Sequence, residues 1–277
     1  MLFGTLLLLR SLTLLLITLA LVAQGCRYDS SPLMYNPSGR VLQIENAKAC
    51  VERGEPVVGV LASDGLILVT TDFKTGRTIK GQDKFVLVDE HCYLACSGFA
   101  ADSVALAKVA KVLCAKYKRD FGSHIPIENL ADQLADWLHA QTRKGSTRPL
   151  GVEALVAGLD EEMGFQIYTV EPQGALWGWR AVCVGGNNCA RNRSLLESSF
   201  PRATRCTIDE VWSKITANRG ELLAALFAGD RAPNTDDLDA SPKKLQLSMC
   251  SRRGPSGALR WDSRQLEIGA VAPSNFI

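Results

Sequence analysis

Residues 57–70 read VVGVLASDGLILVT, two apolar runs separated by the turn residues Ser63-Asp64-Gly65. Short runs rich in valine, leucine and isoleucine, bounded by a turn of this composition, are typical of a β-hairpin. A second pair of apolar runs follows at residues 84–88 and 92–96. The chain therefore predicts four strands in succession, joined in pairs by tight turns.

Helical patterns flank these strands on both sides. Before them, apolar residues recur at helical spacing, which predicts a helix over about residues 38–53 with Ser38 as its N-cap and Gly54 as its stop. After them, an alanine- and valine-rich pattern over residues 102–119 predicts a long helix. A second helix is predicted to begin at Pro126, where leucines keep the spacing of one apolar face.

The second half of the chain repeats this order of strands followed by helices. Runs of strands and runs of helices, instead of strict alternation, favour mainly antiparallel sheets with helices on their outer faces. We therefore expect an α+β fold, a four-layer αββα sandwich, in a single domain over residues 26–277. The further predictions are strands at 152–158, 165–169, 175–179 and 181–184, helices at 188–199 and 207–228, a loop at 231–243, and strands at 245–249 and 258–262.

An apolar leader over residues 1–25 precedes this domain, interrupted by the single charge of Arg10. It ends in Ala23-Gln24-Gly25, which has the small-x-small character of a signal peptidase site. A signal peptide is the simplest interpretation. An uncleaved anchor is the second, because the run approaches the ~20 residues needed to cross a bilayer. An alternative gene start is the third, and the glycosylation sequon at Asn192 is too weak to decide among them.

Composition excludes several classes of function. The net charge is only +2, from 31 basic and 29 acidic residues. This balance gives no bias toward nucleic acid or an acidic membrane, because binding to either needs clustered basic residues. The nine cysteines are odd in number and lack the C-x2-C pairs of a zinc site, which favours a reducing compartment over a disulfide framework. No two of His91, His124 and His139 have ligand spacing, so we interpret them as structural or surface residues and expect no metal and no cofactor.

Residues 27–47 read RYDSSPLMYNPSGRVLQIENA and join an irregular tail, a Pro/Gly turn and an amphipathic helix. This order resembles the N-terminus of 20S proteasome alpha subunits, and Tyr-Asp-Ser is similar to the type-4 variant of that family. Residues 148–151, 164–168 and 178–188 are similar to the same variant. The resemblance covers residues 27 to about 200 and implies the N-terminal nucleophile hydrolase fold of proteasome subunits.

The resemblance also implies that the chain is not an enzyme. Active beta-type relatives use an N-terminal threonine, exposed by removal of a propeptide, whose free amine can serve as base. Residues 53–57 read RGEPV, so no threonine precedes the first strand. We expect a non-catalytic subunit of a threonine-type endopeptidase complex. A self-activating hydrolase is the weakest alternative, because it would need cleavage before Thr70 or Thr71, inside a predicted strand.

Candidate site residues follow from matching positions in the family. Tyr28, Asp29 and Pro37 match three members of the cluster that holds the alpha-subunit tails in the open gate. The fourth member is a tyrosine in the family and is Asn46 here, which predicts a weakened contribution to the open state. Lys84 matches the lysine that pairs with the C-terminal carboxylate of a regulatory ATPase tail, where a charge-assisted bond suits it.

The expected function is therefore that of a structural and gating alpha subunit of the 20S core, acting in ubiquitin-dependent protein degradation. The implied partners are other alpha subunits in a seven-membered ring, the beta ring and regulatory ATPase tails, in the cytoplasm and nucleus. Two alternatives remain because of the leader. One is a secreted or membrane-anchored relative that acts as a binding module, and the other is a proteasome ring inside a membrane-bounded compartment.

Overall fold

A computed structural model describes residue 28 and residues 33–72, 84–200, 205–215, 244–252 and 259–267. Its elements are, in order, α2 (Leu42–Glu52), β1 (Val57–Leu61), β2 (Gly65–Asp72), β3 (Phe85–Asp89), β4 (Cys92–Gly98), α3 (Ala100–Phe121), α4 (Ile127–Thr142), β5 (Val152–Asp160), β6 (Gly164–Val170), β7 (Leu176–Gly178), β8 (Ala181–Val184), α5 (Cys189–Ser199), a helical segment over residues 208–215, β9 (Lys244–Arg252) and β10 (Leu259–Glu267).

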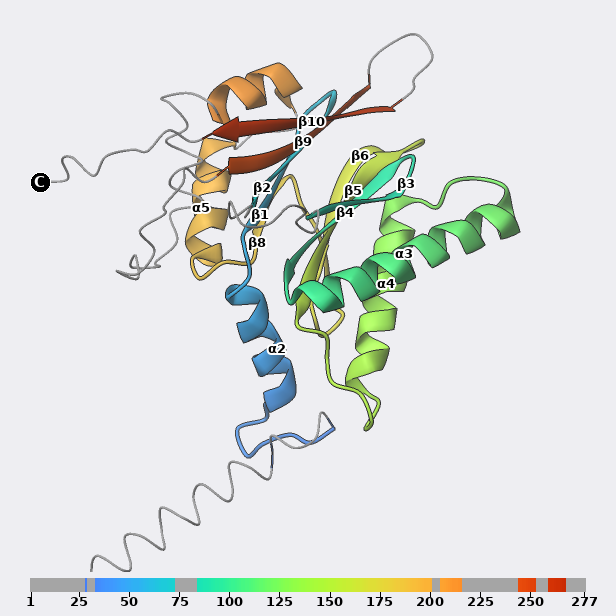
Figure 1. Cartoon of the computed structure of the whole chain (residues 1–277), viewed down its shortest axis with the longest axis vertical. Coiled ribbons are helices and arrows are strands. Elements are labelled where there is room, and N and C mark those ends of the chain that lie inside the picture. The colour runs from blue at the N-terminus through green and yellow to red at the C-terminus, as the bar shows by residue number, and fades with distance from the viewer. Residues whose placement is uncertain are drawn as a thin grey trace, which may run out of the picture.

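The strands form two five-stranded sheets with the orders β10-β9-β2-β1-β8 and β3-β4-β5-β6-β7. Neighbouring strands in both sheets run antiparallel. The first predicted hairpin is confirmed, with Val57 opposite Thr70 and Leu61 opposite Leu66. The two sheets face each other in the middle of the molecule (Figure 1).

Helices cover the outer face of each sheet, so the predicted αββα sandwich is confirmed. α3 and α4 pack on β4 and β5 through one apolar cluster that includes Leu94, Leu106 and Leu134. α5 and the segment 208–215 pack on β1 and β2 through another. A third cluster, with Leu68 and Leu155 among its members, fills the space between the sheets. The arrangement gives the order of layers seen in Figure 1.

α4 shows why the periodic pattern gives this arrangement. Ile127, Leu130, Leu134 and Leu138 are fully buried and recur at the three- and four-residue spacing that places them on one side of a helix. Each such side chain contributes about 1.5–3 kcal/mol by leaving water. Pro126 occupies the N-cap position, where its missing N–H costs no intrahelical hydrogen bond.

The N-terminal helix begins later than the sequence predicts. α2 starts at Leu42, and its N-cap position is held by Val41 without a side-chain hydrogen bond. Ser38 does not cap it. Instead the Oδ1 atom of Asn36 accepts hydrogen bonds from the Ser38 N–H at 3.1 Å, the Ser38 hydroxyl at 2.8 Å and the Arg40 N–H at 2.8 Å. This local turn competes with the first helical turn and delays the helix.

Several other predictions fall wholly or partly outside the described residues. These are the leader, the loop at 231–243 and the part of the predicted helix at 207–228 that follows residue 215. In the part of the chain that the structure describes, no helix has the length and apolar character to cross a bilayer. The sequon residue Asn192 is 2% exposed on α5, so a glycan could not be carried there without disturbing the fold.

Candidate functional site

The chain passes directly from α2 into β1, at one end of the sandwich (Figure 1). The Gly54 N–H donates to the Val51 carbonyl at 2.9 Å and closes the last turn of α2. The Ser97 hydroxyl, at the end of β4, donates to the Glu55 carbonyl at 2.8 Å. The Thr70 hydroxyl on β2 donates to the Pro56 carbonyl at 3.1 Å. Both sheets thus hold the segment that begins the first strand.

Four glycines allow the surrounding segments to meet without intervening side chains, and we call Gly54, Gly98, Gly151 and Gly185 the glycine seam. A Cβ on Gly54 would lie 2.4 Å from the Gly98 nitrogen, and one on Gly151 would lie 2.9 Å from the Cys50 Sγ. At Gly185, which has φ +73°, a Cβ would be 1.8 Å from the Ser97 hydroxyl oxygen. The seam brings the end of α2 against β4 and the start of β5.

The hydroxyl groups at this point are poorly suited to nucleophilic attack. Ser97 and Thr70 are both fully buried, and each donates its proton to a backbone carbonyl that can accept but not abstract it. Neither residue carries a free α-amine, the base that N-terminal threonine nucleophiles use. The hydroxyl groups of Ser97 and Thr70 therefore offer no activated nucleophile at the start of β1.

The predicted gate residues are only partly described. Tyr28 is half-buried, Pro37 is exposed in the turn before α2, and Asn46 is exposed on α2 itself. Asp29 lies outside the described residues. Exposure of Pro37 and Asn46 leaves both accessible to a neighbouring molecule, and their joint role with Tyr28 and Asp29 stays a prediction.

Lys84 is half-buried and immediately precedes β3. Burial raises the pKa of the Cys96 thiol on β4 to about 12, while the Ser103 hydrogen bond and the positive charge of Lys84 oppose this shift. The charge of Lys84 therefore lies close enough to β4 to affect the Cys96 thiol. Its predicted role in binding a carboxylate stays a prediction.

An ion pair fixes the segment that leads into the seam. The guanidinium of Arg148 donates to both carboxylate oxygens of Asp102, at 2.7 and 2.8 Å, and the Gly151 N–H donates to the same carboxylate at 2.9 Å. The Asp102 hydrogen bond raises the pKa of Arg148 above its ordinary value. Asp102 stands in the first turn of α3, where the helix dipole favours a negative charge. This pair ties α3 to the start of β5.

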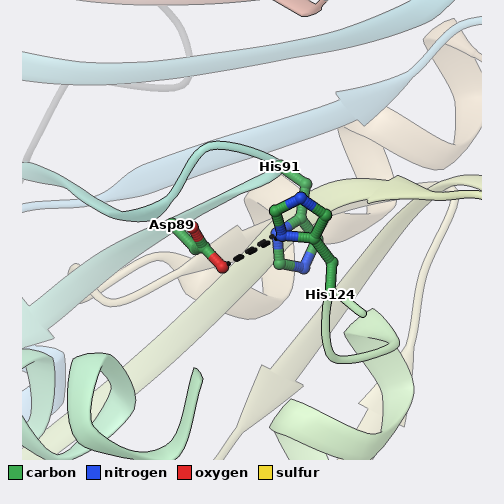
Figure 2. Close-up of side chains that lie close together, drawn as sticks. All are labelled: Asp89, His91 and His124. Carbon is green, nitrogen blue, oxygen red and sulfur yellow. Dashed lines mark hydrogen bonds and ion pairs between the residues drawn. The ribbon is translucent and has the colours of Figure 1, made fainter. Parts of the chain in front are cut away.

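Two histidines and an aspartate converge at the C-terminal end of β3, although no two of the histidines have ligand spacing in the sequence. Figure 2 shows Asp89, His91 and His124 pointing toward one another. The Nδ1 atom of His124 lies 3.2 Å from the Asp89 Oδ2, and the His91 Nδ1 lies 3.6 Å from the same oxygen. Burial lowers the pKa of His91 against the opposing hydrogen bond to the Ile125 carbonyl.

Spacing in the sequence could not show this cluster, because His124 reaches the others only through the path of α3. The signal that exists is local. Asp89 and His91 flank the turn between two predicted strands, and His124 directly precedes a predicted helix start. Turns and helix starts can approach one another at the edge of a layered fold.

A buried acidic group lies under α5. Burial raises the pKa of Glu153 to about 7, although its ion pair with Arg193, at 3.3 Å, opposes the shift. On the same helix, the Cys189 thiol lies beside Cys183. A hydrogen bond with the Cys183 side chain lowers the pKa of Cys189 to about 7, and burial opposes this shift. Arg193 also donates to the Cys183 carbonyl at 3.0 Å. These groups join α5 to β8 and β5.

Comparison with known families identifies the family to which this fold belongs. The model of the family described as "Proteasome subunit" matches residues 51–215. The chain belongs to the proteasome subunit family. The matched span in this family runs from the last turn of α2 through both sheets to the helical segment at 208–215.

Relatives within the proteasome subunit family are similar over most of the chain. Proteasome subunit alpha type-4 of Dictyostelium discoideum is 32% identical over 178 residues, which cover 63% of this chain and 71% of the relative. The subunit of the same name from Spinacia oleracea is 32% identical over 182 residues, or 65% and 73% of the two chains. Alpha type-4-1 of Oryza sativa subsp. indica is 34% identical over 177 residues, or 63% and 70%. The resemblance to alpha type-4 subunits is confirmed.

Proposed function

We propose that the chain acts as a structural alpha subunit of the 20S proteasome core and has no catalytic activity of its own. The observation that carries this proposal is the continuous passage from α2 into β1 across the glycine seam. An active beta-type subunit would present a free threonine at that point. Here the chain continues through the Glu55–Pro56 peptide bond. The Glu55 carbonyl accepts a hydrogen bond from the Ser97 hydroxyl, and the Pro56 carbonyl accepts one from the Thr70 hydroxyl.

Removing α2 to free an N-terminus would not create a nucleophile. Proline at position 56 has no hydroxyl, and the next residue, Val57, is a buried strand residue with an apolar side chain. The seam also couples α2 to the ends of β4 and β5, so the helix is part of the folded domain. Cleavage of substrates belongs to other subunits of the particle.

Assembly with other subunits requires apolar surface that the monomer leaves uncovered. α3 carries three exposed large apolar side chains, Val104, Val112 and Phe121, the last two being 65% and 70% exposed. Leu87 on the adjacent strand β3 is also exposed. Exposed apolar side chains of this size suit burial in an intersubunit contact. The partners of these surfaces are neighbouring alpha subunits and the beta ring.

The gate assignment rests on Pro37 and Asn46 together with Tyr28 and Asp29. Asn46→Tyr would restore the aromatic ring that the family has at this position. We expect this variant to increase peptidase stimulation by a regulatory particle in the assembled core. Glu45→Tyr, at the neighbouring exposed position of α2, is the matched control and leaves the stimulation unchanged. Equal stimulation by the wild type and Asn46→Tyr would remove the gate assignment.

Regulator binding offers a separate test of Lys84. Lys84→Ala removes the ammonium group that would pair with a tail carboxylate, and it weakens association of the core with a regulatory ATPase. Lys108→Ala, at an exposed position of α3, removes the same charge elsewhere and leaves the association intact. If association of the core with the ATPase had the same salt dependence in both variants, that result would count against a specific ion pair between Lys84 and a tail carboxylate.

The decisive experiment for the whole function is isolation of the endogenous protein on a native gel. We expect it to migrate with the subunits of a 20S core, and mass spectrometry of that band to give its mature N-terminus. The cytoplasm and nucleus are the expected compartments. Migration as a free chain that retains residues 1–25 would overturn the proposed function.

A further inference from the structure

We propose that Asp89, His91 and His124 form a binding site for a divalent transition-metal ion, and Zn²⁺ is the ion that we expect. The site connects the turn between β3 and β4 to the loop that precedes α4 (Figure 2). This site is independent of the proteasome function proposed above, since none of its three residues belongs to the seam or to the gate prediction.

The donor atoms are already gathered. One donor atom from each of the three residues lies within 4.8 Å of the other two. Zinc binds histidine nitrogen and carboxylate oxygen at about 2.0–2.2 Å, so donors in a tetrahedral site are ~3.3 Å apart. The distances from the Asp89 Oδ2 to the two histidine Nδ1 atoms are 3.2 Å for His124 and 3.6 Å for His91. The His124 side chain is 30% exposed, so its ring has room to adjust toward a bound ion.

The buried ligand has its lone pair directed into the site. The Ile125 carbonyl can only accept, so the 2.8 Å contact fixes a hydrogen on the Nε2 atom of His91. The Nδ1 atom of the neutral ring then carries a lone pair. His91 is 6% exposed, and this Nδ1 atom is buried without a hydrogen-bond partner. A backbone carbonyl that accepts from the far ring nitrogen is one of the common ways in which proteins orient a histidine metal ligand.

The backbone around His91 is held firmly enough to preorganise the site. The His91 carbonyl accepts the Leu159 N–H at 3.0 Å, which joins the turn to β5. Beneath it, a Cβ on Gly158 would lie 2.4 Å from the His91 carbonyl oxygen and 2.6 Å from the Cδ1 of Ile127. The glycine therefore permits close packing, and the ring of His91 has little freedom to turn away from Asp89.

The donor set selects the class of ion. Two imidazole nitrogens and one carboxylate oxygen suit zinc and neighbouring divalent transition metals better than Mg²⁺ or Ca²⁺, which prefer oxygen ligands alone. Three protein ligands leave a fourth tetrahedral position for water. The bound ion would link the end of β3 to the start of α4, two elements of the second sheet and its helical layer.

The test uses the purified full-length chain and Zn²⁺ itself. Competition with a chromogenic chelator measures affinity and stoichiometry, and zinc-edge X-ray absorption identifies the ligand atoms. We expect one Zn²⁺ per chain with nitrogen and oxygen ligands. His124→Ala and Asp89→Asn change partly exposed side chains, so the fold is retained, and each should weaken zinc binding at least tenfold. Circular dichroism verifies the fold of each variant.

His139→Ala is the matched control, because His139 is exposed on α4 and contacts the Gln173 carbonyl instead of this cluster. The control should bind zinc as the wild type does, and zinc should raise its thermal midpoint, whereas His124→Ala should show no such rise. Two results would overturn the proposal. One is wild-type affinity in both His124→Ala and Asp89→Asn, and the other is a ligand shell that contains sulfur, which would locate the ion at cysteines.

Discussion

The Asp102–Arg148 pair gives the sharpest quantitative prediction, because its two side chains differ in exposure. The Asp102 side chain is 11% exposed and that of Arg148 is 58% exposed. Asp102→Ala removes the acceptor for the guanidinium and leaves the Gly151 N–H without its carboxylate partner. An unsatisfied buried donor costs about 1–3 kcal/mol, so with the lost charged hydrogen bonds we expect a decrease of about 3 kcal/mol in the free energy of unfolding.

Arg148→Ala should cost less, about 1.5–2 kcal/mol. The carboxylate stays buried without its cation, which is unfavourable, but the Gly151 N–H and the N-terminus of α3 still stabilise it. The double variant should cost about as much as Asp102→Ala alone, since a freed arginine at an exposed position is hydrated. The expected coupling energy is therefore about 1.5–2 kcal/mol.

Urea unfolding followed by tryptophan fluorescence measures all three variants. Arg119→Ala is the matched control, because Arg119 pairs with the adjacent Asp120 at a 73% exposed surface position. It should change the free energy of unfolding by less than about 0.5 kcal/mol. Additive costs of the two single changes, within about 0.5 kcal/mol, would refute the reasoning that Asp102 and Arg148 act as one buried unit.

Three further predictions concern titration, packing and reactivity. Because burial raises the pKa of Glu153 from 4.5 to about 7, the folded chain holds a proton there that the unfolded chain has lost, and this residue's contribution to stability falls as pH rises between those values. At about 1.4 kcal/mol per pH unit the loss approaches 3 kcal/mol, and Glu153→Gln should remove it when urea unfolding is compared at pH 5 and pH 8. Gly185→Ala should lower the thermal midpoint sharply, because its Cβ would overlap Ser97 and its φ is +73°; an unchanged midpoint would contradict the seam packing. Cys189, with a pKa lowered to about 7, should react with iodoacetamide at least about tenfold faster than Cys183, whose pKa is raised, as peptide mass spectrometry can measure.

Local patterns in the sequence were enough to predict most elements. Apolar runs around Gly65 gave the first hairpin, and the leucines after Pro126 gave α4, because these signals depend only on neighbours in the chain. The start of α2 was predicted too early, since the competing hydrogen bonds of Asn36 are a matter of turn geometry. Periodicity does not report which of two local hydrogen-bonding patterns is more stable.

The candidate sites depended on contacts that periodicity cannot give. The approach of His91 and His124 follows from the packing of the loop before α4 against the β3–β4 turn, two segments that are distant in the chain. The glycine seam is of the same kind, because Gly54 and Gly98 look like ordinary stop and turn residues until their segments are brought together. By contrast, the lack of a threonine before β1 was plain from the sequence, as it concerns residue types alone.

The glycine seam also bears on what would be needed to place a threonine nucleophile at the start of β1. Replacing Pro56 by threonine would add a hydroxyl, yet that residue would remain inside an uninterrupted chain, with its nitrogen in a peptide bond. Excising α2 would uncover the backbone of Gly98 and Gly151, against which the end of the helix now packs. The hydroxyl and the free amine of an N-terminal threonine nucleophile would thus require both changes. A threonine at position 56 would therefore gain a free α-amine only if the chain also lost α2, the helix that packs against the seam.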